Sequence, residues 1–485
     1  MEKIIRSKGI TESERYLAQL AKRTFLNLWS YPNVYRDVIV NGRRVGKELC
    51  DLLVICGDHV IIFSVKTVDW SKNEDINVAW PRWYKRAIKK SASQVRGAER
   101  WISQNPDRIF LDSACTNKLP IKIPLNNSRI IQGIVVALGA HKACSEFFSD
   151  DSGSFLIIPS MCNNAHIDSS CKEFPPFAIG DVDSMGSFIH VMNDFTLDII
   201  MRELDTITDF TEFLEQKSNL IRSGNLVLAA GEEELLAYYI THMINDDMHG
   251  FADQDGKPLK TTDKIIIPKG HFKDLITNPK YIRKIKANKN SYLWDRLINN
   301  FADHILAETI ISPLGGPFEI TDHEVGIRQM AFEPRTVRRM LSNGILGVLA
   351  IANLHDRFFR AMYPYPKDSG QVIAYAFMTL AHPRRELSGG YEQYRRVRIQ
   401  MLYAYCMGIL KNNRHLKRII GIATEPPGKP NGTSIASEDM ITINTPSTWT
   451  SDIENEIDEL CKQYEIFDED TFRITHHEVQ EYPEE

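Results

Sequence analysis

The chain lacks the patterns that place a protein in a membrane or direct it into a secretory pathway. Its 485 residues contain no run of about 20 apolar residues, the length that a membrane-spanning helix needs. The amino-terminal stretch MEKIIRSKGITESER has no apolar segment of the kind that a secretory signal carries. We therefore expect a protein of the cytoplasm that does not contact a membrane.

The cysteines also form no recognised sequence motif. The eight cysteines include no CxxC pair, so their spacing predicts neither a disulfide framework nor a zinc ribbon, and we expect reduced thiols in the core. The net charge of −5 argues against a protein that coats nucleic acid uniformly, but it does not exclude a local basic surface. The charge therefore has to be considered segment by segment.

The order of apolar patterns predicts an α/β protein of three parts. Residues 1–165 alternate helical and strand patterns, and we expect a mixed central sheet flanked by helices. Residues 166–365 are expected to be mainly helical, with one long helix at 194–221 that is suited to serve as a rigid spacer or to contact a partner protein or a second copy of the chain. Residues 366–485 predict a smaller α/β domain with one βαβ crossover, in which no phosphate-binding glycine pattern follows the first strand.

The most informative stretch is DLLVICGDHVIIFSVKT, residues 51–67, which predicts two strands joined by a tight turn. If the turn centres on Gly57 and Asp58, Asp51 stands directly opposite Ser64 across the hairpin. Because side chains alternate between the two faces of a strand, Lys66 then lies on the same face as Ser64. An acid, a hydroxyl and an amine are thus expected together at the open end of an apolar hairpin.

This arrangement resembles the core of the PD-(D/E)xK nuclease superfamily, whose members have a restriction-endonuclease-like fold. A Thr/Ser cap signal followed by apolar residues at helical spacing predicts a first helix at residues 11–29. The resemblance covers about residues 10–140: this first helix, which carries Glu14, a strand that contains Asp51, and a hairpin that ends at Lys66. It implies a phosphodiester hydrolase dependent on Mg²⁺ or Mn²⁺. Asp51 would correspond to the metal-binding Asp, Lys66 to the lysine that acts on the attacking water, and Glu14 to a further ligand from the first helix.

The sequence departs from the family pattern at one position, because Ser64-Val65-Lys66 stands where an acid-x-Lys triplet is expected. A serine hydroxyl is a poorer Mg²⁺ ligand than a carboxylate. Glu48 and Glu14 are the first candidates to replace the missing acid and Asp69 is a weaker one, while the Val65 carbonyl is a possible oxygen ligand. Glu48 lies three residues before Asp51, so its use requires a bulge or bend in the strand.

A basic stretch at 81–100 follows the hairpin and contains seven Lys or Arg residues against one acid. Such a helix can contact phosphates, and the residues that we assign to nucleic-acid binding, of DNA more than RNA, are Lys85, Lys89, Lys90, Gln94 and Arg96. Gln94 also resembles a helix glutamine that some relatives of the superfamily place near the active site. The interleaved aromatic residues Trp80, Trp83 and Tyr84 are expected to turn into the core.

The other polar clusters of the sequence do not predict a defined functional site. Arginines at 335–339 and 395–398 could extend a nucleic-acid path, although arginines on amphipathic helices more often form surface ion pairs. The histidines of HMINDDMH (242–249) and the pair His476-His477 match no zinc spacing. The acidic segment at 437–439 suggests a second site without a defined chemistry.

Three functions follow from these patterns. The first is a metal-dependent nuclease, for which defence against foreign nucleic acid would be one setting. The second is a catalytically inactive nuclease-like fold that only binds nucleic acid, because of Ser64. The third is a scaffold or assembly protein, because of the helical middle region.

Overall fold

The chain folds into two compact units, Met1–Ile282 and Arg283–Glu485, each with its own sheets and helices. The computed structural model describes residues 7–167, 174–244, 248–253, 255–307, 320–365, 372–382, 390–427, 437–467 and 480–483. Both units mix helices with sheets, so the expected α/β class is confirmed. No helix of the described residues is long and apolar enough to cross a membrane.

The first unit is built on a six-stranded mixed sheet of order β4-β1-β2-β3-β5-β8. β1, β2 and β3 form an antiparallel meander, and β5 and β8 continue the sheet in parallel with β3. The strands are β1 Ser30–Val40, β2 Arg43–Cys56, β3 His59–Thr67, β4 Ile109–Phe110, β5 Ile130–Leu138 and β8 Ile189–Met192. This sheet carries all the residues of the predicted hairpin.

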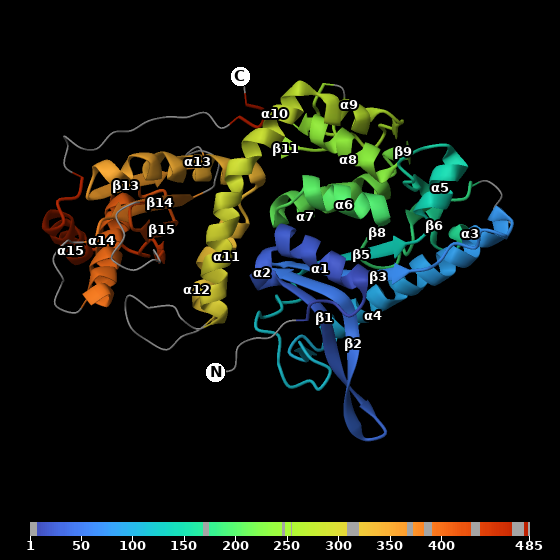
Figure 1. The fold of residues 1–485 in the computed structure, drawn as a ribbon, viewed down its shortest axis with the longest axis horizontal. Coiled ribbons are helices and arrows are strands. Elements are labelled where there is room, and N and C mark those ends of the chain that lie inside the picture. The colour runs from blue at the N-terminus through green and yellow to red at the C-terminus, as the bar shows by residue number, and fades with distance from the viewer. Residues whose placement is uncertain are drawn as a thin grey trace. The chain divides into compact units, whose positions relative to one another are not determined.

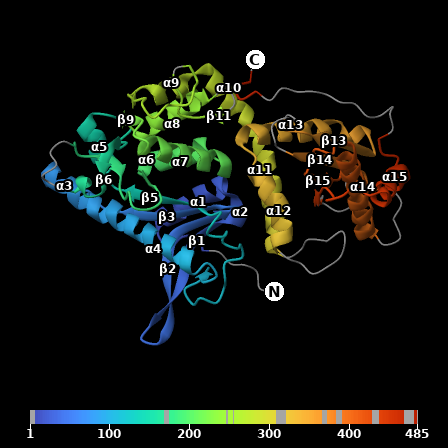
Figure 2. The same cartoon turned by 180° about the vertical axis from the view of Figure 1, so that it is seen from behind.

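Helices pack on both faces of this sheet (Figures 1 and 2). α1 (Glu12–Thr24) and α2 (Leu26–Trp29) lie on one face, where the ring of Phe25 lies 6.1 Å from that of Phe63 in β3. α4 (Lys90–Gln104) lies on the opposite face of the sheet. It packs closely against β5 at Gly133, where an added Cβ would lie 2.6 Å from the side chain of Val95. α4 is preceded by α3 (Ile76–Tyr84) and by a π-helical turn, Lys85–Lys89.

The rest of the first unit surrounds a second, four-stranded sheet of order β12-β9-β6-β7. Its strands are β6 Leu156–Cys162, β7 Ala178–Asp181, β9 Leu226–Ala229 and β12 Ile265–Ile267. The other elements are α5 His141–Phe148, the 3₁₀ turn Asn163–His166, α6 Asp194–Glu203, α7 Ile207–Arg222, α8 Glu232–Thr241, the short pair β10 Met243–Ile244 and β11 Met248–His249, and α9 His271–Thr277. The section expected to be mainly helical therefore contains several strands.

The single long helix predicted at 194–221 is wrong, because the chain forms two helices, α6 and α7. The helix breaks after Glu203, where Leu204 leaves the helical conformation and is buried. Thr206 then caps α7, since its side-chain oxygen accepts a hydrogen bond from the Asp209 N–H. The sequence did not reveal this break because apolar residues recur every three to four positions through both helices, and each helix buries an apolar face.

The second unit contains a four-stranded sheet of order β13-β14-β15-β16. Its strands are β13 Arg357–Met362, β14 Ile373–Leu380, β15 Arg418–Thr424 and β16 Asp439–Asn444. β14 and β15 are parallel and joined by α14 (Gly390–Asn412), so the predicted βαβ crossover is present. The remaining helices are α10 Pro279–Asn288, which spans the division between the units, α11 Tyr292–Leu306, α12 Ile320–Ala331, α13 Arg335–Ile351 and α15 Ser451–Gln463, with 3₁₀ turns at Lys289–Ser291 and Ala352–Leu354.

The structure divides the chain after Ile282, whereas the sequence predicts domain boundaries at residues 165 and 365. Residue 165 lies between β6 and β7, which pair with each other, and β8 completes the sheet that β1 begins. Residue 365 lies between β13 and β14, which also pair. Each expected boundary would therefore cut a sheet.

Most arginines of the two clusters in the second unit form buried ion pairs. Arg338 and Arg335 both bind the carboxylate of Asp295, and Arg398 binds Asp439 and Glu425. These three arginines are buried and do not form a nucleic-acid path. Arg396, in contrast, forms the expected surface ion pair, with Glu392 at 2.7 Å. Part of the HMINDDMH segment and the pair His476-His477 lie outside the described residues.

Candidate active site in the first sheet

The hairpin of β2 and β3 has the predicted register. Leu52 pairs with Phe63 and Cys56 with His59, around a turn at Gly57 and Asp58. Gly57 adopts a φ of 57°, a conformation that glycine tolerates readily. The paired residues end at Leu52 and Phe63, and one further step in the same register corresponds to the predicted pair Asp51 and Ser64. Asp51 is held at this end of the hairpin by the hydrogen bond that it accepts from the Val65 N–H.

A β-bulge brings Glu48 to the face of the sheet that carries Asp51. Val34 pairs with Cys50, but the next residue, Tyr35, pairs with Glu48, so Leu49 is the extra residue on β2. One extra residue reverses the alternation of side chains between the two faces. The bulge that a role for Glu48 requires is therefore present.

Asn33 connects Glu48 to the first helix. Its side-chain amide Nδ2 donates to Glu48 Oε1 and to Glu14 Oε2, each at 2.9 Å. Asn33 lies on β1 between Pro32, which pairs with Leu52, and Val34, which pairs with Cys50, so it stands beside Asp51. The amide thus binds two carboxylates, one from α1 and one from β2, and Asp51 is the neighbouring acid on β2. We call Glu14, Asn33, Glu48 and Asp51 the acidic cluster.

Asp51 carries the electrostatic signature of this cluster. Burial, together with the nearby carboxylates of Glu48 and Glu14, raises the pKa of Asp51 to about 7, against the hydrogen bond that its Oδ2 accepts from the Val65 N–H at 2.6 Å. Burial and neighbouring negative charge both make a carboxylic acid costlier to ionise. The raised pKa of Asp51 therefore reflects its burial first and the two neighbouring acids second.

Glu14 has a structural role besides its place in the cluster. It completes a capping box with Thr11 at the start of α1, the helix start that the sequence predicts. Burial opposes its ionisation, but hydrogen bonds from Asn33 and from the Ile10 and Thr11 N–H groups outweigh burial, so the pKa of Glu14 is lowered. The charge of Glu14 is therefore held in place by the helix that carries it.

Ser64 and Gln94 link the hairpin to the basic helix. The buried Ser64 hydroxyl donates to Gln94 Oε1 at 3.2 Å, which places Gln94 of α4 over the same face of the sheet. Lys66 is two residues further along β3, on that face, and partly exposed, while Asp69 lies exposed beyond the end of the strand. The expectation that Gln94 lies near the predicted site is consistent with this contact.

The predicted metal ligands fit a hard cation by chemical type, since Asp51, Glu48, Glu14 and the Val65 carbonyl all offer oxygen atoms. The carboxylates of Glu48 and Glu14 both contribute to the raised pKa of Asp51, so the three acids lie close enough to interact electrostatically. In the described part of the chain, however, no three His, Cys, Asp or Glu residues are grouped closely enough to hold a metal ion. The Asn33 amide instead occupies the position between Glu14 and Glu48.

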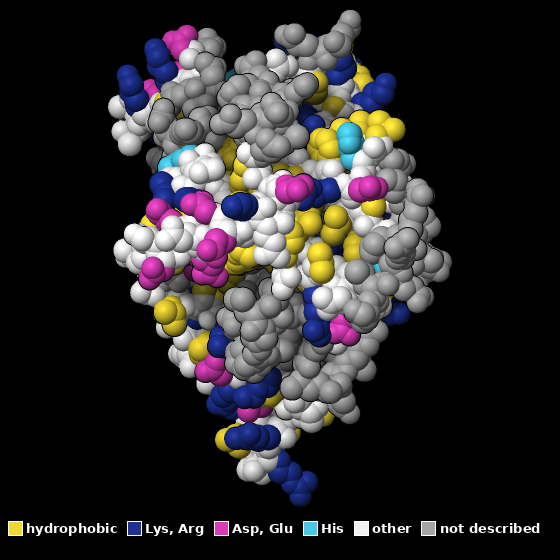
Figure 3. All heavy atoms as spheres, turned by 90° about the vertical axis from the view of Figure 1, so that its left-hand side faces the viewer, with side chains coloured by type: hydrophobic (Ala, Val, Ile, Leu, Met, Phe, Trp, Pro, Cys, Tyr) yellow, Lys and Arg dark blue, Asp and Glu magenta, His cyan; other side chains and the backbone are white. Residues whose placement is uncertain are grey.

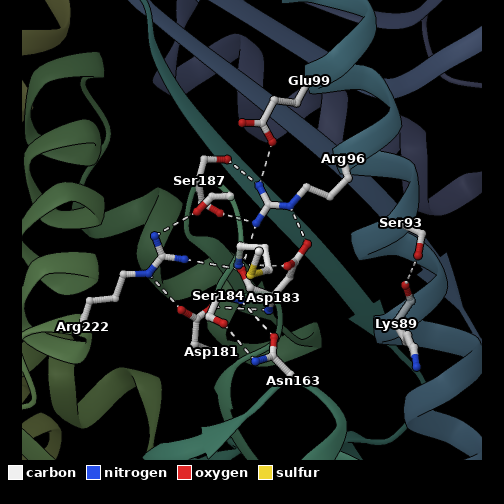
Figure 4. Close-up of polar contacts among 12 residues, drawn as sticks. Lys89, Ser93, Arg96, Glu99, Asn163, Asp181, Asp183, Ser184, Ser187 and Arg222 are labelled. Carbon is white, nitrogen blue, oxygen red and sulfur yellow. Dashed lines mark hydrogen bonds and ion pairs between the residues drawn. The ribbon is translucent and has the colours of Figure 1, made fainter.

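Arg96 cannot serve as the phosphate-binding residue that the sequence suggests, because its guanidinium is fully engaged within the protein. It donates to the Asp183 carboxylate at 2.6 Å, to Glu99 at 2.7 Å and to Ser187 Oγ at 2.8 Å, and to backbone carbonyls of Asp183 and Ser187 (Figure 4). Figure 4 also shows Arg222 in the same network, bound to Asp181. Arg96 holds the 181–187 segment against α4.

The remaining basic residues of the stretch keep their side chains at the surface. Lys85, Lys89 and Lys90 are exposed, and Lys89 contacts the Asn164 side chain at 3.2 Å. Lys90 lies one helical turn before Gln94 on α4. Trp80, Trp83 and Tyr84 are buried, which confirms that the aromatic residues of the stretch turn into the core.

Asn33 is the member of the cluster that sequence reasoning missed. Its only local signal is the Pro32-Asn33 pair inside a strand pattern, which favours an irregular backbone. Asn33 indeed adopts a φ of 48°, which asparagine tolerates better than most residues. Its partners lie far apart in the sequence, so no spacing rule could reveal them.

Comparisons with known proteins do not identify the chain, because no family model, no curated protein and no solved structure matches it.

Proposed function

We propose that the first unit is a divalent-metal-dependent nuclease that hydrolyses phosphodiester bonds, those of DNA in particular. The observation that carries this proposal is the acidic cluster: a bulge at Leu49 turns Glu48 toward Asp51, and Asn33 joins Glu48 to Glu14. The mixed sheet with helices on both faces supports the resemblance to the PD-(D/E)xK superfamily. Ser64 is not an acid, but Glu48 supplies a carboxylate on the same face.

Each residue has a defined task in this proposal. Asp51, Glu48, Glu14 and the Val65 carbonyl would hold Mg²⁺ or Mn²⁺, which when bound supplies a Lewis acid and a water of lowered pKa. Lys66 stabilises the negative charge that develops on the phosphoryl oxygens. Ser64 and Gln94 fix the position of the hairpin end against α4. The exposed Lys85, Lys89 and Lys90 attract the phosphate backbone.

The test is a cleavage assay with matched controls. Plasmid, single-stranded DNA and RNA are incubated with the protein and Mg²⁺, Mn²⁺ or EDTA. We expect Asp51→Asn and Lys66→Met to lower the metal-dependent rate by about 100-fold or more, because each removes charge at the reacting phosphate. Asp58→Asn, at the turn of the same hairpin, and Lys72→Met, both at exposed positions, should keep the rate.

Two outcomes would contradict the proposal. Cleavage that survives Asp51→Asn would show that the acidic cluster is not the site. Binding of nucleic acid without cleavage under any metal condition would favour the catalytically inactive alternative.

A further inference from the structure

The β1–β2 hairpin extends beyond the sheet as a two-stranded ribbon (Figure 1). The pairing continues from Val38 with Val45 to Val40 with Arg43, around an Asn41-Gly42 turn. Both turn residues have positive φ, 51° and 76°, as in the tight turns that Asn-Gly favours. We call residues 38–45 the ribbon.

The ribbon is unusually apolar for an exposed segment. Ile39 is 71% exposed, Val40 50% and Val45 47%. Large side chains exposed together on a projecting segment often mark a binding surface. The ribbon is therefore a candidate binding surface, and its charge indicates the kind of partner that it binds.

The charged residues between 38 and 47 are all basic, and the one acid near them is the buried Asp37, whose carboxylate lies 4.0 Å from Nε of Arg44 while the Arg44 side chain stays 80% exposed. Arg43 and Arg44 lie at the end of the ribbon and Lys47 at its base, and no acid occurs between residues 38 and 47. All three basic residues are exposed, and dark blue Lys and Arg side chains gather in the lowest part of Figure 3, where the ribbon ends. A basic surface complements a phosphate backbone.

The base of the ribbon is fixed relative to the acidic cluster. Gly46 packs so closely that an added Cβ would lie 2.0 Å from the Ser113 carbonyl oxygen. Asp37, which pairs with Gly46, accepts from Arg108 at 2.9 Å. Two residues beyond Gly46, on the same strand, is Glu48 of the cluster. A duplex bound by the ribbon would thus be held at a set distance from the cluster.

We infer that the ribbon inserts into the major groove of duplex DNA, with Arg43 and Arg44 on the flanking phosphates. The ribbon has three residue pairs and a two-residue turn, and it projects about 10 Å from its base to its last pair, at about 3.3 Å per residue. The B-DNA major groove, about 12 Å wide and 8.5 Å deep, admits a two-stranded ribbon. Double-stranded RNA has a major groove too narrow and deep for side chains to read. The inference deepens the proposed function and rests on it, since it names the substrate class of the acidic cluster.

The test measures binding separately from cleavage, in EDTA, with the full-length chain. Fluorescence anisotropy is recorded with a DNA duplex, an RNA duplex of the same sequence and a single strand, at several salt concentrations. We expect preference for the DNA duplex. The double variant R43A/R44A should weaken that binding by about tenfold or more and lower the salt slope by about 2, because two phosphate contacts are lost.

The control variant K142A/K257A removes the same charge at two other exposed positions of the first unit. It should leave duplex binding nearly unchanged. Equal loss in both variants, no loss in R43A/R44A, or equal affinity for the RNA duplex would overturn the inference. A changed oligomeric state of R43A/R44A in sedimentation, with unchanged DNA binding, would overturn it as well and make the ribbon a contact between copies.

The cleavage assay keeps the two proposals apart. If R43A/R44A binds DNA normally while the wild-type protein cuts DNA with Mg²⁺, the ribbon inference fails and the nuclease stands. If the wild-type protein cuts under no metal condition but loses duplex binding in R43A/R44A, the nuclease fails and the ribbon stands as a DNA-binding element.

Discussion

At the scale of single residues, the question is whether the Asn33 amide or a bound cation compensates the carboxylates of the acidic cluster. One amide donor serves both Glu14 and Glu48, and Asp51 accepts a hydrogen bond from the Val65 N–H. A buried polar group is stable only if its hydrogen bonds are satisfied. Without a cation the amide of Asn33 therefore compensates Glu48, and it shares the compensation of Glu14 with the Ile10 and Thr11 N–H groups.

Replacing this amide tests whether a cation can take its place. Asn33→Asp removes both donated hydrogen bonds and adds a fourth acid, so we expect it to lower the free energy of unfolding by about 2 to 4 kcal/mol in EDTA. If the cluster binds metal, excess Mg²⁺ should recover part of this loss. Urea unfolding followed by tryptophan fluorescence measures both effects.

The control for this variant is Asn126→Asp, which adds the same charge at an exposed position. Its stability should respond little to either EDTA or Mg²⁺. If the loss in Asn33→Asp were the same with and without Mg²⁺ or Mn²⁺, the cluster would not be a metal site.

At the scale of elements, the start of α1 combines a structural and a chemical function. Thr11 and Glu14 form the capping box that fixes the first turn, and the same Glu14 carboxylate reaches Asn33. A capping box accepts glutamine in place of glutamate at its third helical position. The two functions of Glu14 can therefore be separated by substitution.

We expect Thr11→Ala and Glu14→Gln to have opposite profiles. Thr11→Ala loses the cap and should lower the free energy of unfolding by about 1 kcal/mol while cleavage by the folded protein is retained. Glu14→Gln keeps the cap but removes one charge, so cleavage should fall while stability is nearly kept. Cleavage rates and urea unfolding of both variants check this, and full activity of Glu14→Gln would remove it from the ligand set.

The first turn of α8 predicts a pH dependence. Burial, with a smaller contribution from the Glu234 carboxylate, raises the pKa of Glu233 to about 7, against a hydrogen bond from Ser154. Its pKa in the unfolded chain is near 4.5, so the folded protein keeps a proton that the unfolded chain releases as the pH rises from about 4.5 to 7. Stability contributed by protonated Glu233 is therefore lost over this range.

Glu233→Gln should remove this loss. We expect the variant to match the wild-type protein below about pH 4.5 and to exceed it by up to about 3 kcal/mol above pH 7, because each unit of pKa shift corresponds to about 1.4 kcal/mol. Thermal unfolding of both proteins across this range measures the difference. Glu146→Gln, at a side chain that is 69% exposed, is the control and should show no such trend.

The elements that the sequence predicted well are those whose determinants are local. The apolar alternation and the Gly57-Asp58 turn were sufficient for the register of β2 and β3, and a cap signal was sufficient for α1. The engagement of Arg96 could not be predicted, because Asp183 and Ser187 lie about 90 residues away along the chain. The Leu49 bulge could be predicted only in part. A role for Glu48 beside Asp51 requires a bulge, but its position follows from the pairing of β2 with β1.

At the scale of the whole molecule, the division of the chain decides which part can carry the proposed activity. The acidic cluster, α4 and the ribbon all lie within Met1–Ile282. The six-stranded sheet is complete only with β8, and β6 only with β7. Residues beyond 165 thus belong to the same fold as the cluster.

Truncation tests this division directly. A fragment of residues 1–282 should fold cooperatively and retain metal-dependent cleavage, because it keeps both sheets of the first unit and every residue of the acidic cluster. A fragment of residues 1–165 lacks β7, β8 and β9 and leaves an edge of β5 without its partner, so we expect it to aggregate. Circular dichroism, thermal unfolding and the plasmid assay compare the fragments. A folded, active 1–165 would show that the smaller part suffices, whereas a folded but inactive 1–282 would mean that the second unit takes part in the reaction.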